Sequence, residues 1–133
     1  MKVTIYGCGQ VGLKTAEALI KQKHEVTIID RDADSFRKIE ESELCHFVVG
    51  DAIDQEVLHK AETDQADVFM ALTGEDNANI FAAQASKELF KVKKVIVRIA
   101  DPVRAQAFSE MGLVTVCSTD LISDAVRKKM AAK

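Results

Sequence analysis

The fold is decided by the opening stretch Ile5-Tyr6-Gly7-Cys8-Gly9-Gln10-Val11-Gly12. A short apolar run leads into three glycines in a Gly-x-Gly-x-x-Gly spacing, and a helix-like segment follows. In this setting Gly7 allows a tight turn, Gly9 lets the backbone approach a pyrophosphate, and Gly12 lets helix and strand pack closely. Free N–H groups at the helix start would bind the phosphates. A purely structural turn is the alternative, but the strand–turn–helix context favours a ligand.

Asp30 lies 18 residues after Gly12, at the end of the next predicted strand. A carboxylate at this place accepts hydrogen bonds from ribose hydroxyls and repels a 2′-phosphate, which favours NAD(H), ATP, ADP or AMP over NADP. Arg31 complicates this expectation, because an arginine nearby can accommodate that phosphate. We interpret Arg31 as a solvated loop residue, because Asp30 is present.

Outward from this stretch, short apolar runs alternate with amphipathic segments of helical length, which predicts an α/β fold. Continuous apolar runs are typical of parallel strands buried on both faces. We expect a Rossmann-like doubly wound parallel sheet of about six strands, and the dinucleotide fold implies the strand order 3-2-1-4-5-6. The length fits one domain, residues 1–133. The predicted strands are Val3–Tyr6, Val26–Ile29, Phe47–Val49, Val68–Leu72, Val95–Ile99 and Val114–Val116, and the predicted helices are Val11–Lys23, Asn77–Leu89, Val103–Met111 and Asp120–Met130.

Three finer expectations concern packing. The first helix would place Val11, Ala18 and Leu19 on one face, with its lysines available for solvent. Ser118 or Thr119 would cap the last helix at its start. Phe81, Phe90 and Phe108 are expected in the core.

Composition excludes several classes of protein. The formal net charge of -3 argues against a nucleic-acid binder, and the short basic run Arg127–Lys129 is better explained as compensating a helix C-terminus. The three cysteines have no disulfide or metal spacing, which fits the cytosol. The histidines, with His59 on a predicted helix, have no metal-ligand spacing either. No apolar run approaches the roughly 20 residues that a membrane span needs, so a membrane role would require a partner.

Further polar residues follow other predicted strands, where open α/β sheets bind ligands. They are Gly50-Asp51-Ala52, Thr73-Gly74 and the group Asp76, Asn77 and Asn79. Arg98 lies inside a predicted buried strand and needs a partner there. That partner is either Asp101 or Asp51 or a ligand phosphate, and the two interpretations are compatible. Cys8 is interpreted as a small packing residue, although a helix start could lower its pKa and make it a redox sensor.

Several stretches together resemble the N-terminal nucleotide-binding domain (RCK or TrkA-N domain) of Trk/Ktr-type potassium-uptake regulatory proteins. Beyond the glycine turn, the Gly-Asp-Ala, Thr-Gly-x-Asp-x-x-Asn and Val-Arg-Ile elements in this order are the more specific part. The matching stretches are Ile5–Gly12, Val26–Asp32, Val49–Ala52, Ala66–Val68, Ala71–Asn79 and Val97–Pro102.

The resemblance implies a role for each matching residue. Phosphates would lie on the turn, the ribose on Asp30, and the adenine edge along Asp51 and Ala52; Thr73 and Gly74 would line the cleft, and Arg98 would reach phosphate. Residues 119–130 resemble a crossover helix that packs on a partner subunit. The full set of expected ligand-binding residues is Gly7, Cys8, Gly9, Gln10, Val11, Gly12, Asp30, Arg31, Asp51, Ala52, Thr73, Gly74 and Arg98.

The implied function is a cytoplasmic regulatory subunit, peripheral at the inner face of the membrane, that gates a potassium transporter or channel when a nucleotide changes its shape. Members form homodimers that assemble into octameric rings. Many carry a second, C-terminal regulatory domain, which would here be a separate chain or a missing part of a fragment. The sequence shows no catalytic set such as Tyr-x-x-x-Lys, so we expect no enzyme. The alternatives are a small NAD-dependent oxidoreductase and a nucleotide-binding assembly module unrelated to transport.

Overall fold

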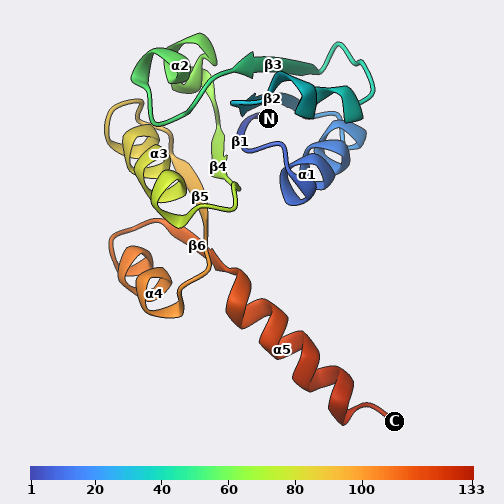
Figure 1. Cartoon of the computed structure of the whole chain (residues 1–133). Helices are drawn as coiled ribbons and strands as arrows, with labels where there is room; N and C mark the ends of the chain where they lie inside the picture. The colour runs from blue at the N-terminus through green and yellow to red at the C-terminus, as the bar shows by residue number, and fades with distance from the viewer.

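The computed structural model describes residues 1–133 and shows strands and helices alternating along the chain (Figure 1). The six strands coincide with the six predicted ones to within two residues at each end. The elements are β1 (Lys2–Tyr6), α1 (Gln10–Lys21), β2 (Glu25–Asp30), η1 (Ala33–Lys38), β3 (Cys45–Val49), α2 (Gln55–Lys60), η2 (Thr63–Gln65), β4 (Val68–Ala71), α3 (Asp76–Glu88), β5 (Lys94–Ile99), α4 (Pro102–Glu110), β6 (Val114–Cys117) and α5 (Ser118–Ala131).

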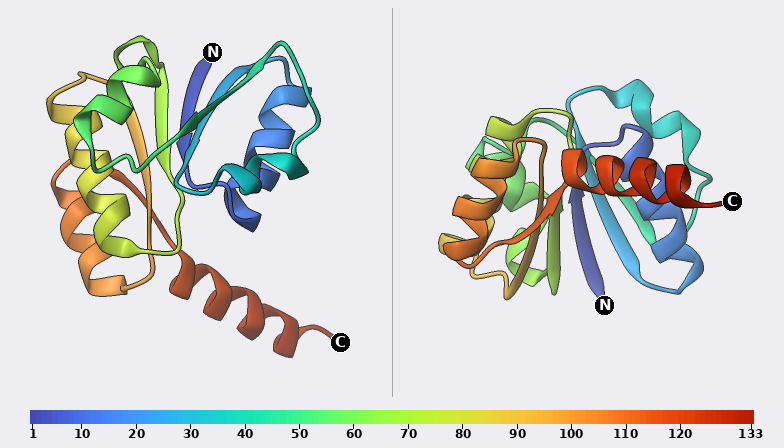
Figure 2. Two further views of the ribbon diagram at one scale, coloured as in Figure 1. Left: turned by 45° about the horizontal axis from the view of Figure 1, so that its top comes forward. Right: turned by 90° about the horizontal axis from the view of Figure 1, so that it is seen from below.

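All six strands pair in parallel in the order β3-β2-β1-β4-β5-β6, which confirms the predicted doubly wound sheet. Helix α1 and the 3-10 helix η1 cover one face of the sheet, and α2, α3 and α4 cover the other (Figure 2). The chain reverses its direction of travel across the sheet at β1, whose neighbours are β2 and β4. The carboxyl ends of these three strands therefore meet at one crevice, where open α/β sheets bind ligands.

The core has two halves because successive side chains of a strand point to opposite faces. In β1, Val3 and Ile5 pack into the half beneath α1, whereas Tyr6 packs into the half beneath α3. Each half consists mainly of Val, Ile, Phe and Ala side chains with almost no exposure. The burial of both faces explains why the strands read as continuous apolar runs.

The packed face of α1 differs from the expected one. Gly12 and Ala16 are its buried residues, Leu19 is half-buried, and Val11 and Ala18 are exposed. The cause is the close approach of α1 to the turn, since a Cβ on Gly12 would lie 1.8 Å from the carbonyl oxygen of Gly7. The smallest residues therefore face the sheet, although a hydrophobicity pattern favours larger ones.

The segment between β3 and β4 contains the short helix α2, which confirms that His59 is helical. The Asp54 side chain caps α2 by accepting a hydrogen bond from the N–H of Glu56. With six residues, α2 is too short to show a helical repeat in the sequence, and so its bounds could not be predicted.

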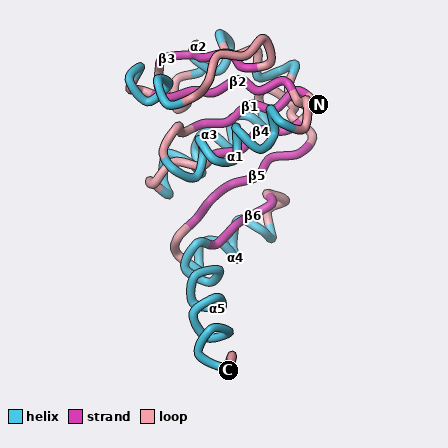
Figure 3. Tube along the Cα trace, turned by 90° about the vertical axis from the view of Figure 1, so that its right-hand side faces the viewer, coloured by secondary structure: helices cyan, strands magenta, loops and turns pink.

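The last helix begins at Ser118, and its N-cap is Cys117 rather than Ser118 or Thr119, because β6 runs directly into α5. Helix α5 leaves the carboxyl edge of the sheet and extends away from the body (Figures 1 and 3). None of its residues is buried, and its apolar side chains Leu121, Ile122, Val126 and Met130 are all exposed.

Of the three phenylalanines expected in the core, Phe90 is buried, and Phe108 is half-buried and packs against the core half beneath α3. Phe81 is 57% exposed, so its assignment to the core is wrong. It lies on α3, whose core-facing positions are taken by alanines, Asn79 and Ile80. No helix of the structure combines the length and the apolar character needed to cross a membrane.

Candidate functional site

A cleft of about 570 Å³ opens at the crevice formed by the carboxyl ends of β1, β2 and β4. Nine of the thirteen expected ligand-binding residues line it, and Cys8, Gly12, Asp51 and Ala52 do not. Tyr6, Leu72 and Glu75 line it without having been expected. The lining residues are Tyr6, Gly7, Gly9, Gln10, Val11, Asp30, Arg31, Leu72, Thr73, Gly74, Glu75 and Arg98.

The glycine turn presents unpaired donors to this cleft. Gly7 has a φ of 108°, which L side chains rarely adopt, and its N–H donates to the carbonyl of Ile29 at 2.8 Å. Helix α1 then begins at Gln10, and its first turn carries no acidic residue. The N–H groups of Gln10, Val11 and Gly12 donate to no acceptor of the protein, because they precede the first i-to-i−4 bond of the helix. Such donors, with the positive end of the helix dipole, favour an anion.

Asp30 supports the turn as well as lining the cleft. One carboxylate oxygen accepts a 2.7 Å hydrogen bond from the N–H of Cys8, and the other accepts a 2.8 Å bond from the N–H of Asp32. These bonds orient the carboxylate at the end of β2. Each oxygen retains a further lone pair, so the group can still accept bonds from a ribose.

Cys8 contributes its backbone rather than its thiol. The side chain is 4% exposed, lies in the core half beneath α1, and donates to the carbonyl of Ser35 at 3.4 Å. Burial, together with the nearby carboxylate of Asp30, raises the pKa of Cys8 to about 11. The pKa of Cys8 thus lies above its ordinary value rather than below it, which agrees with the interpretation as a packing residue.

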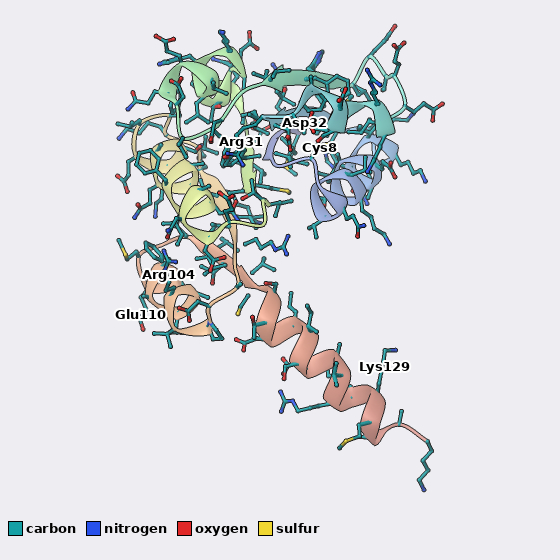
Figure 4. The ribbon with its side chains drawn as sticks, viewed as in Figure 1. Cys8, Arg31, Asp32, Arg104, Glu110 and Lys129 are labelled. Carbon is teal, nitrogen blue, oxygen red and sulfur yellow. The ribbon has the colours of Figure 1, made fainter.

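Arg31 follows β2 directly and lines the cleft (Figure 4). Its side chain is 65% exposed, as expected of a solvated loop residue, and its guanidinium lies 3.9 Å from the carboxylate of Asp51 and 3.8 Å from that of Glu75. Asp51 is itself held, because the hydroxyl of Tyr6 and the N–H of Ile53 donate to it. Burial and this carboxylate raise the pKa of Tyr6 above its ordinary value. Sequence reasoning had singled out Arg31 and Asp51 but had not paired them.

Ala52 is fully buried in the core half beneath α3. It does not line the cleft, so its contact with an adenine edge stays a prediction.

The loop Thr73-Gly74 is held in place by Asn79, whose side chain is fully buried. The amide oxygen of Asn79 accepts from the N–H and the hydroxyl of Thr73, and its NH₂ group donates to the carbonyls of Thr73 and Arg98. One buried amide thus joins the loop after β4 to the end of β5. This network accounts for the asparagine of the Thr-Gly-x-Asp-x-x-Asn element.

Asp76 and Asn77 make hydrogen bonds to other parts of the chain and do not line the cleft. The carboxylate of Asp76 accepts from the N–H groups of Ala100 and Asp101, and the amide oxygen of Asn77 accepts from Arg104 at 2.7 Å.

Arg98 is half-buried and lines the cleft. No carboxylate lies within 4.0 Å of its guanidinium, because Asp51 pairs with Arg31 and the side chain of Asp101 caps α4 by accepting from Val103. The expected ion pair is therefore not formed, and the contact of Arg98 with a phosphate stays a prediction.

A second cavity of about 430 Å³ lies at the opposite edge of the sheet, around the starts of β1 and β2. Its charged groups largely pair with one another, as in the contacts of Glu25 with Lys2 and His46 at 3.8 and 3.7 Å. It contains none of the expected ligand-binding residues.

Comparison with known proteins extends these observations. The model of the TrkA-N domain family matches residues 3–119. The Trk system potassium uptake protein TrkA of Streptomyces coelicolor is 38% identical over 130 residues, which are 98% of this chain and 58% of that protein. The chain spans about half the length of the curated relatives it matches.

Solved structures share the fold at low identity. The Kef CTD of Shewanella denitrificans in its AMP-bound form has a TM-score of 0.80 at 16% identity and covers 100% of this chain and 84% of that chain. The GsuK channel bound to NAD has a TM-score of 0.72 at 20% identity and covers 88% of this chain and 21% of that chain. At these identities the likeness supports the Rossmann-like fold alone.

Proposed function

The chain belongs to the TrkA-N domain family, and from its cleft we propose that it is a nucleotide-binding regulatory domain of a potassium uptake system. One observation carries this proposal. The unpaired N–H groups of the glycine turn, the carboxylate of Asp30 and the unpaired Arg98 all meet at one cleft. Together they match an anionic pyrophosphate or phosphate chain joined to a ribose.

The proposed ligands are NAD(H) and the adenine nucleotides ATP, ADP and AMP. All of them contain the ribose and the phosphates that the cleft can hold. Structural neighbours bound to AMP and to NAD support this choice of chemistry. A ribose on Asp30 with phosphates on Gln10 and Val11 would leave the far phosphate or the second half of a dinucleotide toward Thr73 and Arg98, because β4 and β5 lie on that side of β1.

A bound nucleotide would act by changing the shape of the domain and not by taking part in a reaction. Tyr6 also lines the cleft, but its hydroxyl donates to Asp51 and burial raises its pKa, so it is not available as an acid or base. Arg98 lies near the end of β5, whose other neighbour β6 runs directly into α5. A ligand that binds Arg98 can therefore bias the position of α5 if it prefers one of two arrangements.

Helix α5 is the proposed dimer contact. Three of its exposed apolar side chains, Ile122, Val126 and Met130, recur every four residues and form a stripe on a helix that has no buried residue of its own. A helix that projects from the body in this way needs a second surface to cover that stripe. We assign the surface to a second copy of the chain, and further assembly into a ring, at the inner face of the membrane beneath a potassium pore, is part of the same proposal.

The proposal is tested by potassium uptake in potassium-depleted cells that contain the whole regulatory protein and its pore. Gly9→Ala, which adds a methyl group where a pyrophosphate would approach, is compared with the wild type and with Gln65→Ala at the opposite edge of the sheet. The expected result is uptake that no longer follows the cell's nucleotide state in Gly9→Ala alone. Unchanged regulation in that variant would contradict the proposal, and steady NAD(H) turnover by the purified protein would favour an oxidoreductase.

A further inference from the structure

Arg31 occupies the place that decides whether a ribose may carry a 2′-phosphate. It follows Asp30 directly at the end of β2, and an arginine near this position accommodates the 2′-phosphate of NADP in dinucleotide-binding folds. The carboxylate of Asp30 would repel that phosphate, whereas the guanidinium of Arg31 would attract it. The sequence alone therefore does not say which of the two groups prevails.

In the structure the exposed guanidinium of Arg31 has a carboxylate within 4.0 Å on each of two sides. Arg31 itself follows β2. Asp51 follows the neighbouring strand β3, and Glu75 lies in the loop after β4, which is on the other side of β2 in the sheet. Arg31 reaches both carboxylates, at 3.9 and 3.8 Å. Asp51 cannot easily turn away, because one of its oxygens accepts from both Tyr6 and Ile53.

The local charge follows from these contacts. One guanidinium is accompanied by the carboxylates of Asp30, Asp51 and Glu75, so the surroundings of the ribose carry an excess of negative charge. A phosphate monoester carries a charge of about -1.5 to -2 at neutral pH and would be repelled. A neutral 2′-hydroxyl would not be.

We infer that the Arg31–Asp51–Glu75 cluster makes the cleft selective for nucleotides with a free ribose 2′-hydroxyl, because the two acids neutralise an arginine that would otherwise bind a 2′-phosphate. This inference rests on the proposed nucleotide site and adds to it the residues that set its ligand class. Asp30 alone does not set the selectivity, since Arg31 beside it could offset its charge. Asp51 and Glu75 act through Arg31 and are specificity-determining residues.

The test compares the dissociation constants of NADH and NADPH, and of AMP and its 2′-phosphorylated derivative, by calorimetry on the purified chain. The key variant is Asp51→Asn with Glu75→Gln, which keeps the size of both side chains and the acceptor for Tyr6 while removing two charges. The matched control is Glu62→Gln with Asp64→Asn, two exposed acids around η2, before the start of β4. A third protein adds Arg31→Ala to the key variant.

The wild type is expected to bind the 2′-hydroxyl form of each pair more tightly. In the key variant the preference should shrink by about tenfold, the size expected from removing two charges within several Å of the phosphate and freeing an arginine. The preference should return when Arg31 is also removed, and it should stay within about twofold of the wild type in the control, whose charges are screened by distance.

Three results would overturn the inference: equal affinity of the wild type for both forms, an unchanged preference in the key variant, or a loss of preference that persists without Arg31. Each of these requires that the wild type binds nucleotides, so each leaves the proposed function standing. Binding of none of the four compounds by the wild type would instead remove the proposed function and the inference with it.

Discussion

The backbone N–H of Cys8 donates a 2.7 Å hydrogen bond to the carboxylate of Asp30, which ties the glycine turn to the end of the neighbouring strand. The residue expected to bind the ribose thus also sets the shape of the phosphate-binding turn. Loss of binding after a change at Asp30 consequently has two causes, a lost ribose contact and a displaced turn.

The first prediction concerns this double role. Asp30→Ala removes the acceptor of the N–H groups of Cys8 and Asp32, and we expect a loss of about 1–3 kcal/mol in the free energy of unfolding. Asp30→Asn keeps one acceptor oxygen and should lose less. Urea denaturation of the three proteins checks this order, and equal stability of Asp30→Ala and the wild type would show that the turn does not depend on the carboxylate.

The second prediction separates two glycines of the turn. A Cβ on Gly9 meets nothing within 4 Å, whereas a Cβ on Gly12 meets the carbonyl oxygen of Gly7 at 1.8 Å. Gly9→Ala should therefore change the free energy of unfolding by less than about 1 kcal/mol, the usual range for this change at a helix start. It should nonetheless weaken nucleotide binding by more than about tenfold, because the backbone must approach the pyrophosphate there.

Gly12→Ala should instead cost more than about 3 kcal/mol, because backbone must move to relieve the clash. Thermal denaturation of both variants, with calorimetry on Gly9→Ala, distinguishes the roles. A destabilised Gly9→Ala or a stable Gly12→Ala would contradict the assigned geometry.

The third prediction concerns Asn79, which has no exposed surface and makes hydrogen bonds to both Thr73 and Arg98. Asn79→Ala leaves several buried polar groups unpaired and should cost more than about 2 kcal/mol. Asn79→Asp keeps the acceptor for Thr73 but loses the donors to both carbonyls, so it should also be destabilised. If either variant were as stable as the wild type, the network would not hold the loop.

The fourth prediction follows from the buried thiol of Cys8. Its pKa is raised from 9.0 to about 11, so the folded state binds the proton more tightly than the unfolded state does. This contribution to stability is complete below pH 9 and is lost as the pH rises through about 11. Burial raises the pKa of Cys45 as well, which adds a contribution of the same sign.

The free energy of unfolding should accordingly fall as the pH rises from 9 to 11, and Cys8→Ala should reduce that slope. The same burial predicts that Cys117, which is half-exposed, reacts with iodoacetamide before Cys8 at neutral pH. Preferential alkylation of Cys8 would instead revive its interpretation as a redox sensor.

The fifth prediction tests α5. Ile122→Asp and Val126→Asp place charges in the exposed apolar stripe and should shift the chain from dimer to monomer in sedimentation equilibrium. Their effect on the fold should be small, because α5 buries no residue. Ala131→Asp, on the side of the helix opposite Ile122 by its 3.6-residue repeat, serves as the control. A monomeric wild type would contradict the proposed contact.

The sheet could be predicted because its strands are short continuous apolar runs separated by helical segments, and because the glycine turn identifies the dinucleotide fold. Its order brings together residues from four separate stretches, so the position of the cleft followed from the sequence as well. Gly9, Asp30 and Thr73 line it as expected.

What could not be predicted depends on contacts between side chains. The exposure of Val11 and Ala18 follows from how closely α1 approaches Gly7, which no hydrophobicity pattern records. The exposure of Phe81 follows from which face of α3 meets the sheet. Likewise, Asp51 was one of two candidate partners for Arg98, and its pairing with Arg31 depends on where the loops after β2 and β3 place their ends.

The central claim is that the cleft binds an adenine nucleotide, and calorimetric titration of the purified chain with NADH, NAD, ATP, ADP and AMP tests it most directly. Gly9→Ala serves as the comparison, because it is expected to keep the fold. We predict binding of at least one of these nucleotides to the wild type, weakened by more than about tenfold in Gly9→Ala. Binding of none of them to the folded wild type, or equal binding to both proteins, would contradict the claim.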